Sequence, residues 1–348
     1  MRKWVIGLGG LLILQMVLAV GLNFRQEEYG ALEPTEKVMA FDVSAVDNVR
    51  IDAESDQHLV LKKQEGEWQL PALNGFPADQ GSVTGLLDKL AGLQKGWPVA
   101  TTAGAARRFK VSDEAFERKI TLGRGEERLA TLFVGTSPGF RKVHVRTPEG
   151  DAIYAAEFSA FESGVKPEDW IDKTVLKHQA NDIQEAKLPG FTLKRQGDRL
   201  VVADLKEGEA VVENEAKRLL DQLAGLTIRS VLGTEAKPEY GQDKPALRYT
   251  LVLKSGEKAT YVFSKPKDAD YYVLKAPPRD EYFQLDTWTV DPIKEVTRDK
   301  LIRKQAEDKT TVEEHAEGAG VESAKESPVA PETLPGEGTD TAEEPGTP

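Results

Sequence analysis

Two stretches of the chain carry the same spacing of leucines. Residues 86–93 read LLDKLAGL and residues 219–226 read LLDQLAGL. In both, the leucines fall at positions i, i+1, i+4 and i+7, which lie on one face of an α-helix. A helix with such an apolar face is stable only when another element covers it. The spacing therefore predicts two helices of one design, and Asp79 is suited to cap the first of them.

Apolar and polar residues alternate on both sides of each predicted helix, which is typical of β-strands with one buried face. Short turns rich in glycine, proline and charged residues separate these segments. Landmarks recur at nearly constant distances: 131 residues from Gly66 to Gly197, 133 from Leu86 to Leu219, 131 from Gly125 to Gly256, and 129 from Asp151 to Asp280. Unrelated segments would not keep this register, so the sequence predicts an internal duplication.

The predicted fold class is therefore α+β, with two tandem domains of similar design. Each domain is expected to be a mainly antiparallel sheet packed by its leucine-rich helix. The first repeat is predicted over residues 46–176 and the second over residues 177–303. Two copies indicate tandem domains and not a solenoid.

An apolar run covers residues 4–24 and is interrupted only by Gln15 and Asn23. Its twenty-one residues, at about 1.5 Å each, span roughly 30 Å, the thickness of a bilayer's hydrocarbon core. We therefore expect a transmembrane signal-anchor helix over residues 1–24, followed by a juxtamembrane tether over residues 25–45.

The flanking charges give this anchor a direction. Arg2 and Lys3 precede the apolar run, which favours a cytoplasmic N-terminus and sends the remainder out of the cytoplasm. The alternative is a cleaved signal peptide, for which the small residues at 19–21 would be a passable site. The length of the run favours a retained anchor.

The formal net charge of −12 is concentrated near the C-terminus. Residues from 307 onward carry twelve acidic and two basic side chains, which leaves about −2 for the rest of the chain. This segment has almost no aromatic residues, so we expect a disordered acidic tail over residues 304–348. The near-neutral remainder has no basic stripe to follow a phosphate backbone, which argues against nucleic-acid binding. The absence of cysteine excludes disulfides, thiolate catalysis and cysteine-bound metals.

One motif suggests a serine hydrolase. Residues 135–139 read GTSPG and match the pattern around a nucleophilic serine, here Ser137. That mechanism needs a strand, a sharp elbow and a helix, and it needs the amide of the next residue for the oxyanion hole. The next residue is Pro138, which has no amide hydrogen, and residues 140–146 alternate like a strand. We therefore interpret the motif as a turn.

Other candidate chemistry is equally weak. The histidines show no metal-ligand spacing, and those at 58 and 144 are expected on solvent-facing or rim positions of strands. Asp268 and Asp270 are too few for a calcium loop. Glu157 and Asp286 end matching hairpins in different repeats, so a catalytic carboxylate pair is not expected. We predict no catalytic, cofactor-binding or metal-binding residue, and no cofactor.

Aromatic residues gather near the end of the second repeat. Cross-strand packing in the core would explain them. Their density also allows a face that contacts a partner, since exposed aromatic residues suit protein contact. The predicted partner-contact face consists of Tyr261, Phe263, Tyr271, Tyr272, Tyr282 and Trp288.

Several of these features together resemble one bacterial family, the domain of unknown function numbered 4340. They are the apolar N-terminal segment, the hairpin at Gly66-Glu67-Trp68, the Pro77-Ala78-Asp79 cap with its leucine helix, and residues 239–246, EYGQDKPA, ahead of a strand. The resemblance covers roughly residues 1–303. The first repeat departs from it at residues 108–113, which read RFKVSD in place of the tyrosine-glycine element.

The resemblance implies a protein at the bacterial inner membrane, crossing it once, with its bulk in the periplasm. Members are sometimes encoded beside ABC-type transporters, which implies an inner-membrane protein complex as partner. We therefore expect a non-enzymatic, membrane-anchored scaffold or accessory protein of such a complex. The alternative is a periplasmic module that binds an envelope glycan or lipid between the repeats, near residues 170–178. A hydrolase is the third hypothesis.

Overall fold

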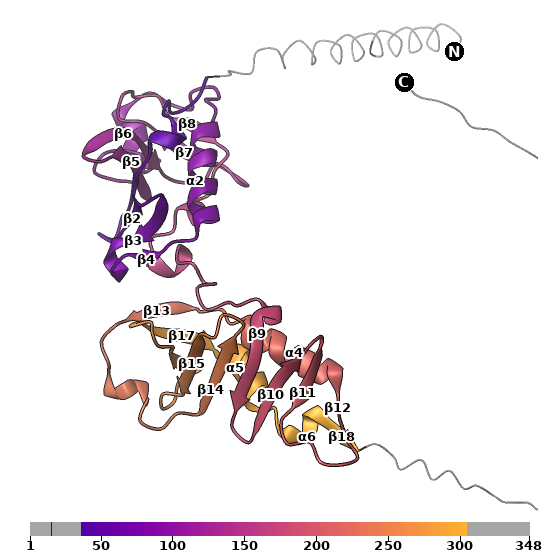
Figure 1. The fold of residues 1–348 in the computed structure, drawn as a ribbon. Helices are drawn as coiled ribbons and strands as arrows, with labels where there is room; N and C mark the ends of the chain where they lie inside the picture. Colours follow the sequence, from indigo (N-terminus) through magenta and orange to yellow (C-terminus); the bar gives the residue numbers. More distant parts are fainter. Residues whose placement is uncertain (1–14, 16–35, 305–348) are drawn as a thin grey trace, which may run out of the picture. The chain divides into compact units, whose positions relative to one another are not determined.

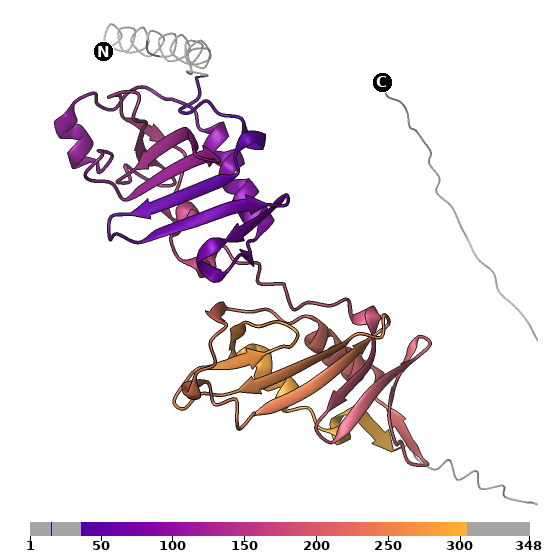
Figure 2. The ribbon, with the colours of Figure 1, turned by 60° about the vertical axis from the view of Figure 1, so that its left-hand side comes forward.

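The computed structural model describes Gln15 and residues 36–304 (Figures 1 and 2). This part of the chain is a mixed α+β protein with two antiparallel eight-stranded sheets and few helices, which confirms the predicted class at that level. The predicted anchor over residues 1–24, the tether up to residue 35 and the tail after residue 304 lie outside the described residues, Gln15 excepted. Among the described helices, none is long and apolar enough to cross a membrane.

The first sheet uses strands from residues 48–156 only. Its order is β4-β3-β2-β1-β5-β6-β7-β8, and neighbouring strands are antiparallel. The predicted turns at Gly66 and Gly125 join β2 to β3 and β5 to β6, and both glycines have the positive φ that such tight turns require. The strands are β1 (Asn48–Ala53), β2 (His58–Gln64), β3 (Glu67–Leu70), β4 (Phe76–Pro77), β5 (Arg118–Arg124), β6 (Glu127–Val134), β7 (Val143–Arg146) and β8 (Tyr154–Ala156).

The second sheet uses strands from residues 183–286 only. Its order is β11-β10-β9-β14-β15-β16-β17-β13. The strands are β9 (Ile183–Leu188), β10 (Phe191–Gln196), β11 (Arg199–Val202), β13 (Ser230–Gly233), β14 (Leu247–Leu253), β15 (Lys258–Ser264), β16 (Tyr271–Lys275) and β17 (Tyr282–Asp286). A separate two-stranded sheet pairs β12 (Glu209–Val211) with β18 (Ile302–Lys304).

The two leucine helices cover one face of their own sheets (Figures 1 and 2). Helix α2 (Gln80–Gly92) begins after Asp79, whose side chain accepts a hydrogen bond of 2.8 Å from the Ser82 amide, as predicted. Helix α4 (Glu213–Ala224) has Val212 at its N-cap and no side-chain cap. The buried residues are Val83, Leu86, Leu87 and Leu90 in α2, and Ala216, Leu219, Leu220, Leu223 and Ala224 in α4.

The remaining helices are short. The α-helices are α3 (Ala103–Arg108), α5 (Thr287–Lys294) and α6 (Arg298–Leu301). The 3₁₀ helices are η2 (Val43–Ala45), η3 (Pro71–Leu73), η4 (Ala160–Ser163), η5 (Pro167–Asp169), η6 (Ala180–Asp182) and η7 (Pro238–Tyr240). Helix η4 follows the last strand of the first sheet in the chain, and α5 follows β17 of the second.

The two sheets share seven strands in one order. The order β3-β2-β1-β5-β6-β7-β8 corresponds to β11-β10-β9-β14-β15-β16-β17. The register agrees as well, because the cross-strand row Lys119–Phe133–Arg146 has its counterpart in Arg248–Val262–Lys275, each residue 129 positions later. The interpretation of the halves as tandem domains with a boundary at residue 176 stays a prediction.

Candidate binding site

The open face of the first sheet, the face turned away from α2, carries charged residues. Alternation along β1 buries Val49 and Ile51 toward α2, so Arg50 and Asp52 point to the open face. Asp52 pairs across the strands with Lys119, and Lys119 pairs with Phe133. Asp52, Lys119 and Phe133 therefore lie in one cross-strand row, and Arg50 lies in the next row of the same surface.

Part of this open face is covered by a lid, residues 103–116, which comprises α3 and the loop after it. Ala106 and Val111 of the lid pack with Phe133 and Ile153 in a small buried cluster, apart from the main core. Arg146 holds the lid, because its guanidinium donates to the Val111 carbonyl oxygen at 2.7 Å and to Asp113 at 2.9 Å. The guanidinium also lies 4.8 Å from the centre of the Phe133 ring.

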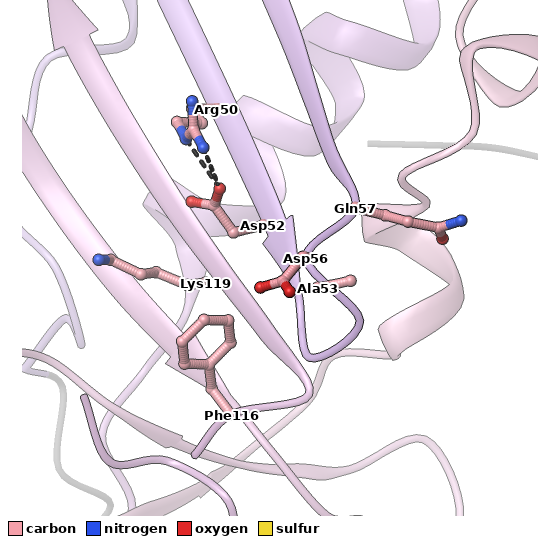
Figure 3. A pocket seen from close by; sticks show the side chains of 7 residues that line it. All are labelled: Arg50, Asp52, Ala53, Asp56, Gln57, Phe116 and Lys119. Carbon is pink, nitrogen blue, oxygen red and sulfur yellow. Dashed lines mark hydrogen bonds and ion pairs between the residues drawn. The ribbon is translucent and has the colours of Figure 1, made fainter. Parts of the chain in front are cut away.

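A hollow of about 340 Å³ opens where the lid ends (Figure 3). Phe116, at the end of the lid, forms one wall and packs on Phe133 with ring centres 5.9 Å apart. The β1–β2 turn, with Asp56, forms a second wall. Figure 3 shows Asp56, Phe116 and Lys119 around the same space. The lining residues are Arg50, Asp52, Ala53, Asp56, Gln57, Phe116 and Lys119.

The charges in the hollow balance. Arg50 donates to Asp52 through Nε at 2.8 Å, and its terminal nitrogen lies 2.6 Å from the same carboxylate oxygen. Among residues 36–304, no carboxylate forms an ion pair with Lys119 and no cation pairs with Asp56. The Lys119 ammonium lies 5.8 Å from the Phe133 ring centre. Nearby, the Glu54 carboxylate accepts from Lys110 at 2.8 Å and raises the pKa of that lysine. The hollow therefore offers both donors and acceptors, with an aromatic wall.

The predicted partner-contact face does not form one surface. Tyr261, Phe263 and Tyr272 are buried on the α4 side of the second sheet, where they contribute to the core. Neighbouring strand residues point to opposite faces, so Tyr271 lies on the open side, half-buried. Tyr282 is half-buried, also on the open side of its strand, and Trp288 is exposed in α5. The three core residues are unable to contact a partner, which corrects the prediction for them.

Three tyrosine hydroxyls of the second half are shaped by burial, which raises their pKa values, and two of them also have a hydrogen-bond partner. Burial raises the pKa of Tyr261 to about 12, and its hydroxyl lies 2.7 Å from Nε2 of His178. Burial and a hydrogen bond of 2.6 Å to Asp291 raise the pKa of Tyr272. Tyr249, stacked on Tyr261, is fully buried, and its hydroxyl has no partner among the described residues. These groups are neutral core elements at physiological pH.

Ser137 lies in an exposed loop after β6. Its Oγ lies 2.7 Å from the carbonyl oxygens of both Gly139 and Lys142, either of which can accept its single hydrogen. No helix follows the residue, because β7 is the next regular element. The serine thus occupies a turn, as its sequence context predicts.

The histidines are dispersed. His58 is exposed at the start of β2, as expected, whereas His144 is buried, which corrects the predicted solvent-facing or rim position. Phe109 of the lid stacks on the His144 ring with centres 4.1 Å apart. Nδ1 of this ring lies 3.0 Å from the Thr136 hydroxyl. Within residues 36–304, no group of three or more acidic or histidine side chains is placed to hold a metal ion.

Two sets of residues were missed by sequence reasoning. The hollow on the first sheet is one, because its walls come from the β1–β2 turn and the lid, far apart in the sequence. The exposed aromatic residues are the other: Trp97, Phe140 and Phe161 are all strongly exposed in the first half. For Phe161 one sequence signal was available: it lies in a segment without strand alternation, so no strand pattern assigned it to a buried face.

Comparison with protein families identifies one match. The family model described as "Domain of unknown function (DUF4340)" matches residues 68–245, which is half of the chain. The match runs as one stretch from β3 in the first sheet to the residue before Ala246 and β14 in the second. Comparison with curated proteins and with solved structures found no match. The chain belongs to the DUF4340 family of domains of unknown function.

Proposed function

We propose that the protein is a non-enzymatic accessory protein of an inner-membrane complex, held at the bacterial membrane by the apolar segment at residues 4–24. Its two α+β halves, interpreted as tandem copies of one domain, lie in the periplasm and contact protein partners. An ABC-type transporter is the complex that the family resemblance favours.

The observation that carries this proposal is an exposed aromatic residue in each half, placed two residues after the N-cap of the helix that follows the sheet strands. Phe161 is the second residue after Ser159, the N-cap of η4, and is 97% exposed. Trp288 is the second residue after Asp286, the N-cap of α5, and is 71% exposed. Each helix is the first after the last strand, in chain order, of its eight-stranded sheet.

Exposure of these rings is unfavourable for the isolated protein. Burying a large aromatic side chain stabilises by roughly 2–3 kcal/mol, so an exposed ring leaves that free energy unused. Single exposed apolar residues are common on soluble proteins, but a recurrence at matching positions indicates a shared use. Tryptophan and other aromatic residues dominate the energetics of protein interfaces, which supports partner contact at both sites.

Crosslinking in living cells, followed by purification from detergent-solubilised membranes, tests the proposal. The native chain should recover a membrane-protein partner, and Phe161→Ser together with Trp288→Ser should remove most of it. The matched control is Phe140→Ser, because Phe140 is 90% exposed in the β6–β7 loop. Recovery of the native chain only as a monomer, or equal loss with the control, would contradict the proposal.

A further inference from the structure

The hollow on the open face of the first sheet has the features of a built binding site. Its floor comes from β1 and β5, two strands of regular register at the centre of the sheet. Its walls, the β1–β2 turn and Phe116, stand at the end of that floor where β1 ends and β5 begins, because Ala53 pairs with Arg118 (Figure 3). A floor on rigid strands with walls from loops is the usual construction of a small-ligand site.

The lining already holds its polar groups in place. Arg50 and Asp52 fix each other through two short contacts, so neither must reorganise when a ligand arrives. Lys119 and Asp56, in contrast, form no ion pair with any described residue. The ammonium presents donors and the carboxylate presents acceptors to whatever occupies the hollow.

The charge balance selects the ligand class. Two cations and two carboxylates line the hollow, so a phosphate or another anion would meet repulsion from Asp52 and Asp56. A lipid chain in the hollow would remove water from four charged groups, because Phe116 and Ala53 are the only apolar lining residues. A neutral ligand with many hydroxyl groups satisfies both donors and acceptors and keeps one flat apolar face for an aromatic ring.

We propose that this hollow, at Asp52, Asp56, Phe116 and Lys119, binds a neutral carbohydrate. One face of a sugar ring lies against Phe116, and its hydroxyls donate to Asp56 and Asp52 and accept from Lys119. A volume of about 340 Å³ is near the lower end of the range for small-molecule sites, which suits one or two sugar rings. The site is independent of the proposed protein partner, since neither Phe161 nor Trp288 lines it.

Two substitutions remove ligand groups without straining the fold. Asp56 is exposed with a φ of 57°, a conformation that glycine adopts freely, so Asp56→Gly removes the side chain and its carboxylate without straining the backbone. Lys119→Met keeps the apolar stem and removes the ammonium. The matched controls are Asp268→Gly, another exposed aspartate with a φ of 59°, and Lys62→Met, an exposed lysine on β2 outside the hollow.

The experiment presents the full chain, in detergent, to an array of neutral and acidic glycans, then titrates the strongest neutral ligand by calorimetry. The native protein should bind at least one neutral glycan. Asp56→Gly and Lys119→Met should each weaken that binding about tenfold or more, while the two controls change it less than about twofold. Binding to no neutral glycan overturns the proposal. So does binding confined to acidic glycans, or a loss that the controls share.

Discussion

The open faces of the two sheets share one framework and differ in what stands on it. Lys119, Phe133 and Arg146 occupy the same register as Arg248, Val262 and Lys275. The connection between the first two strands, however, has four residues in the first half and two in the second: Glu54–Gln57 against Pro189–Gly190. The longer connection forms a wall of the hollow, and the shorter one cannot extend over the sheet.

The covers of the two open faces differ in the same way. In the first half the lid reaches Arg146, His144 and Phe133. In the second half the loop after η7 reaches Ser264 and Val273, because the Gln242 amide donates to the Ser264 hydroxyl at 2.8 Å and to the Val273 carbonyl at 3.0 Å. A shared strand frame fixes where a site can lie, and the connections decide whether it exists.

The largest expected effect tests the shared frame. Leu90 in α2 and Leu223 in α4 lie 133 positions apart and are both fully buried. Replacing either by alanine leaves a cavity and should lower the free energy of unfolding by about 3 kcal/mol. Urea unfolding measures the loss, and amide hydrogen exchange should locate each loss in the sheet that the helix covers. If one substitution lowered the free energy of unfolding strongly and the other hardly changed it, the two helices would not have equivalent roles in their halves.

A smaller loss of stability should distinguish the lid of the first half from the loop after η7 that covers the second. A Cβ at Gly135 would lie 2.0 Å from the Phe109 carbonyl oxygen, so Gly135→Ala should push the lid away and cost about 2 kcal/mol. Hydrogen exchange should rise in residues 103–116.

Its counterpart, 129 positions later, is Ser264, which already carries a side chain. The Ser264 hydroxyl donates to the Tyr240 carbonyl oxygen, so Ser264→Ala should cost only about 1 kcal/mol. Equal effects at the two positions, measured by urea unfolding, would show that the lid is not packed tightly on Gly135.

A pair of cross-strand tyrosines in the second sheet should respond differently to the loss of the hydroxyl group. Tyr261→Phe removes a hydroxyl bonded to His178 and should lower the free energy of unfolding by about 1 kcal/mol. Tyr249→Phe removes a buried hydroxyl without a partner among the described residues, so it should be neutral or raise stability by up to about 1 kcal/mol. Thermal unfolding of both variants checks the signs, and destabilisation by Tyr249→Phe would indicate a bound water there.

The smallest effect depends on pH and belongs to the second half. A hydrogen bond from Arg298, at 2.5 Å, and another from the Lys206 amide lower the pKa of Glu209 from 4.5 to about 2. Because the folded-state pKa is the lower one, this stabilisation is present above pH 4.5 and is lost as the pH falls toward about 2.

Glu209→Gln should therefore flatten that part of the stability curve. The difference in free energy of unfolding between the native chain and the variant should shrink as the pH falls from 6 through the acid range. Glu207→Gln, an exposed neighbour without an ion pair among the described residues, is the control. A constant difference across this range would exclude the Arg298 contact as its cause.

Local sequence patterns predicted much of the fold. Leucine spacing located both helices, turn glycines located the hairpins, and Asp79 was identified as a cap, because each of these signals acts over a few residues. The hollow was not predictable in this way. Its floor joins Asp52 to Lys119, and one of its walls, Phe116 of the lid, lies more than 50 residues along the sequence from the turn that forms the other wall.

The aromatic residues show the limit of composition as a signal. Tyr271 and Tyr272 are adjacent in the sequence, yet a strand must send them to opposite faces. The predicted face was chosen only because aromatic residues are dense in this part of the sequence. Side chains alternate between the two faces of a strand, so that choice grouped residues that lie on opposite faces. His144 was misplaced for a related reason, because Phe109, 35 residues earlier, covers a position that a strand pattern alone leaves open.

The pairing of β12 with β18 has a practical consequence for anyone who shortens or tags the chain. β18 is the last described strand, and it pairs with the segment that leads into α4. Cutting before Ile302 would remove the strand partner of Val211, the residue directly before the N-cap of α4. A cut or an affinity tag placed after Lys304 keeps the pairing of β12 with β18 intact.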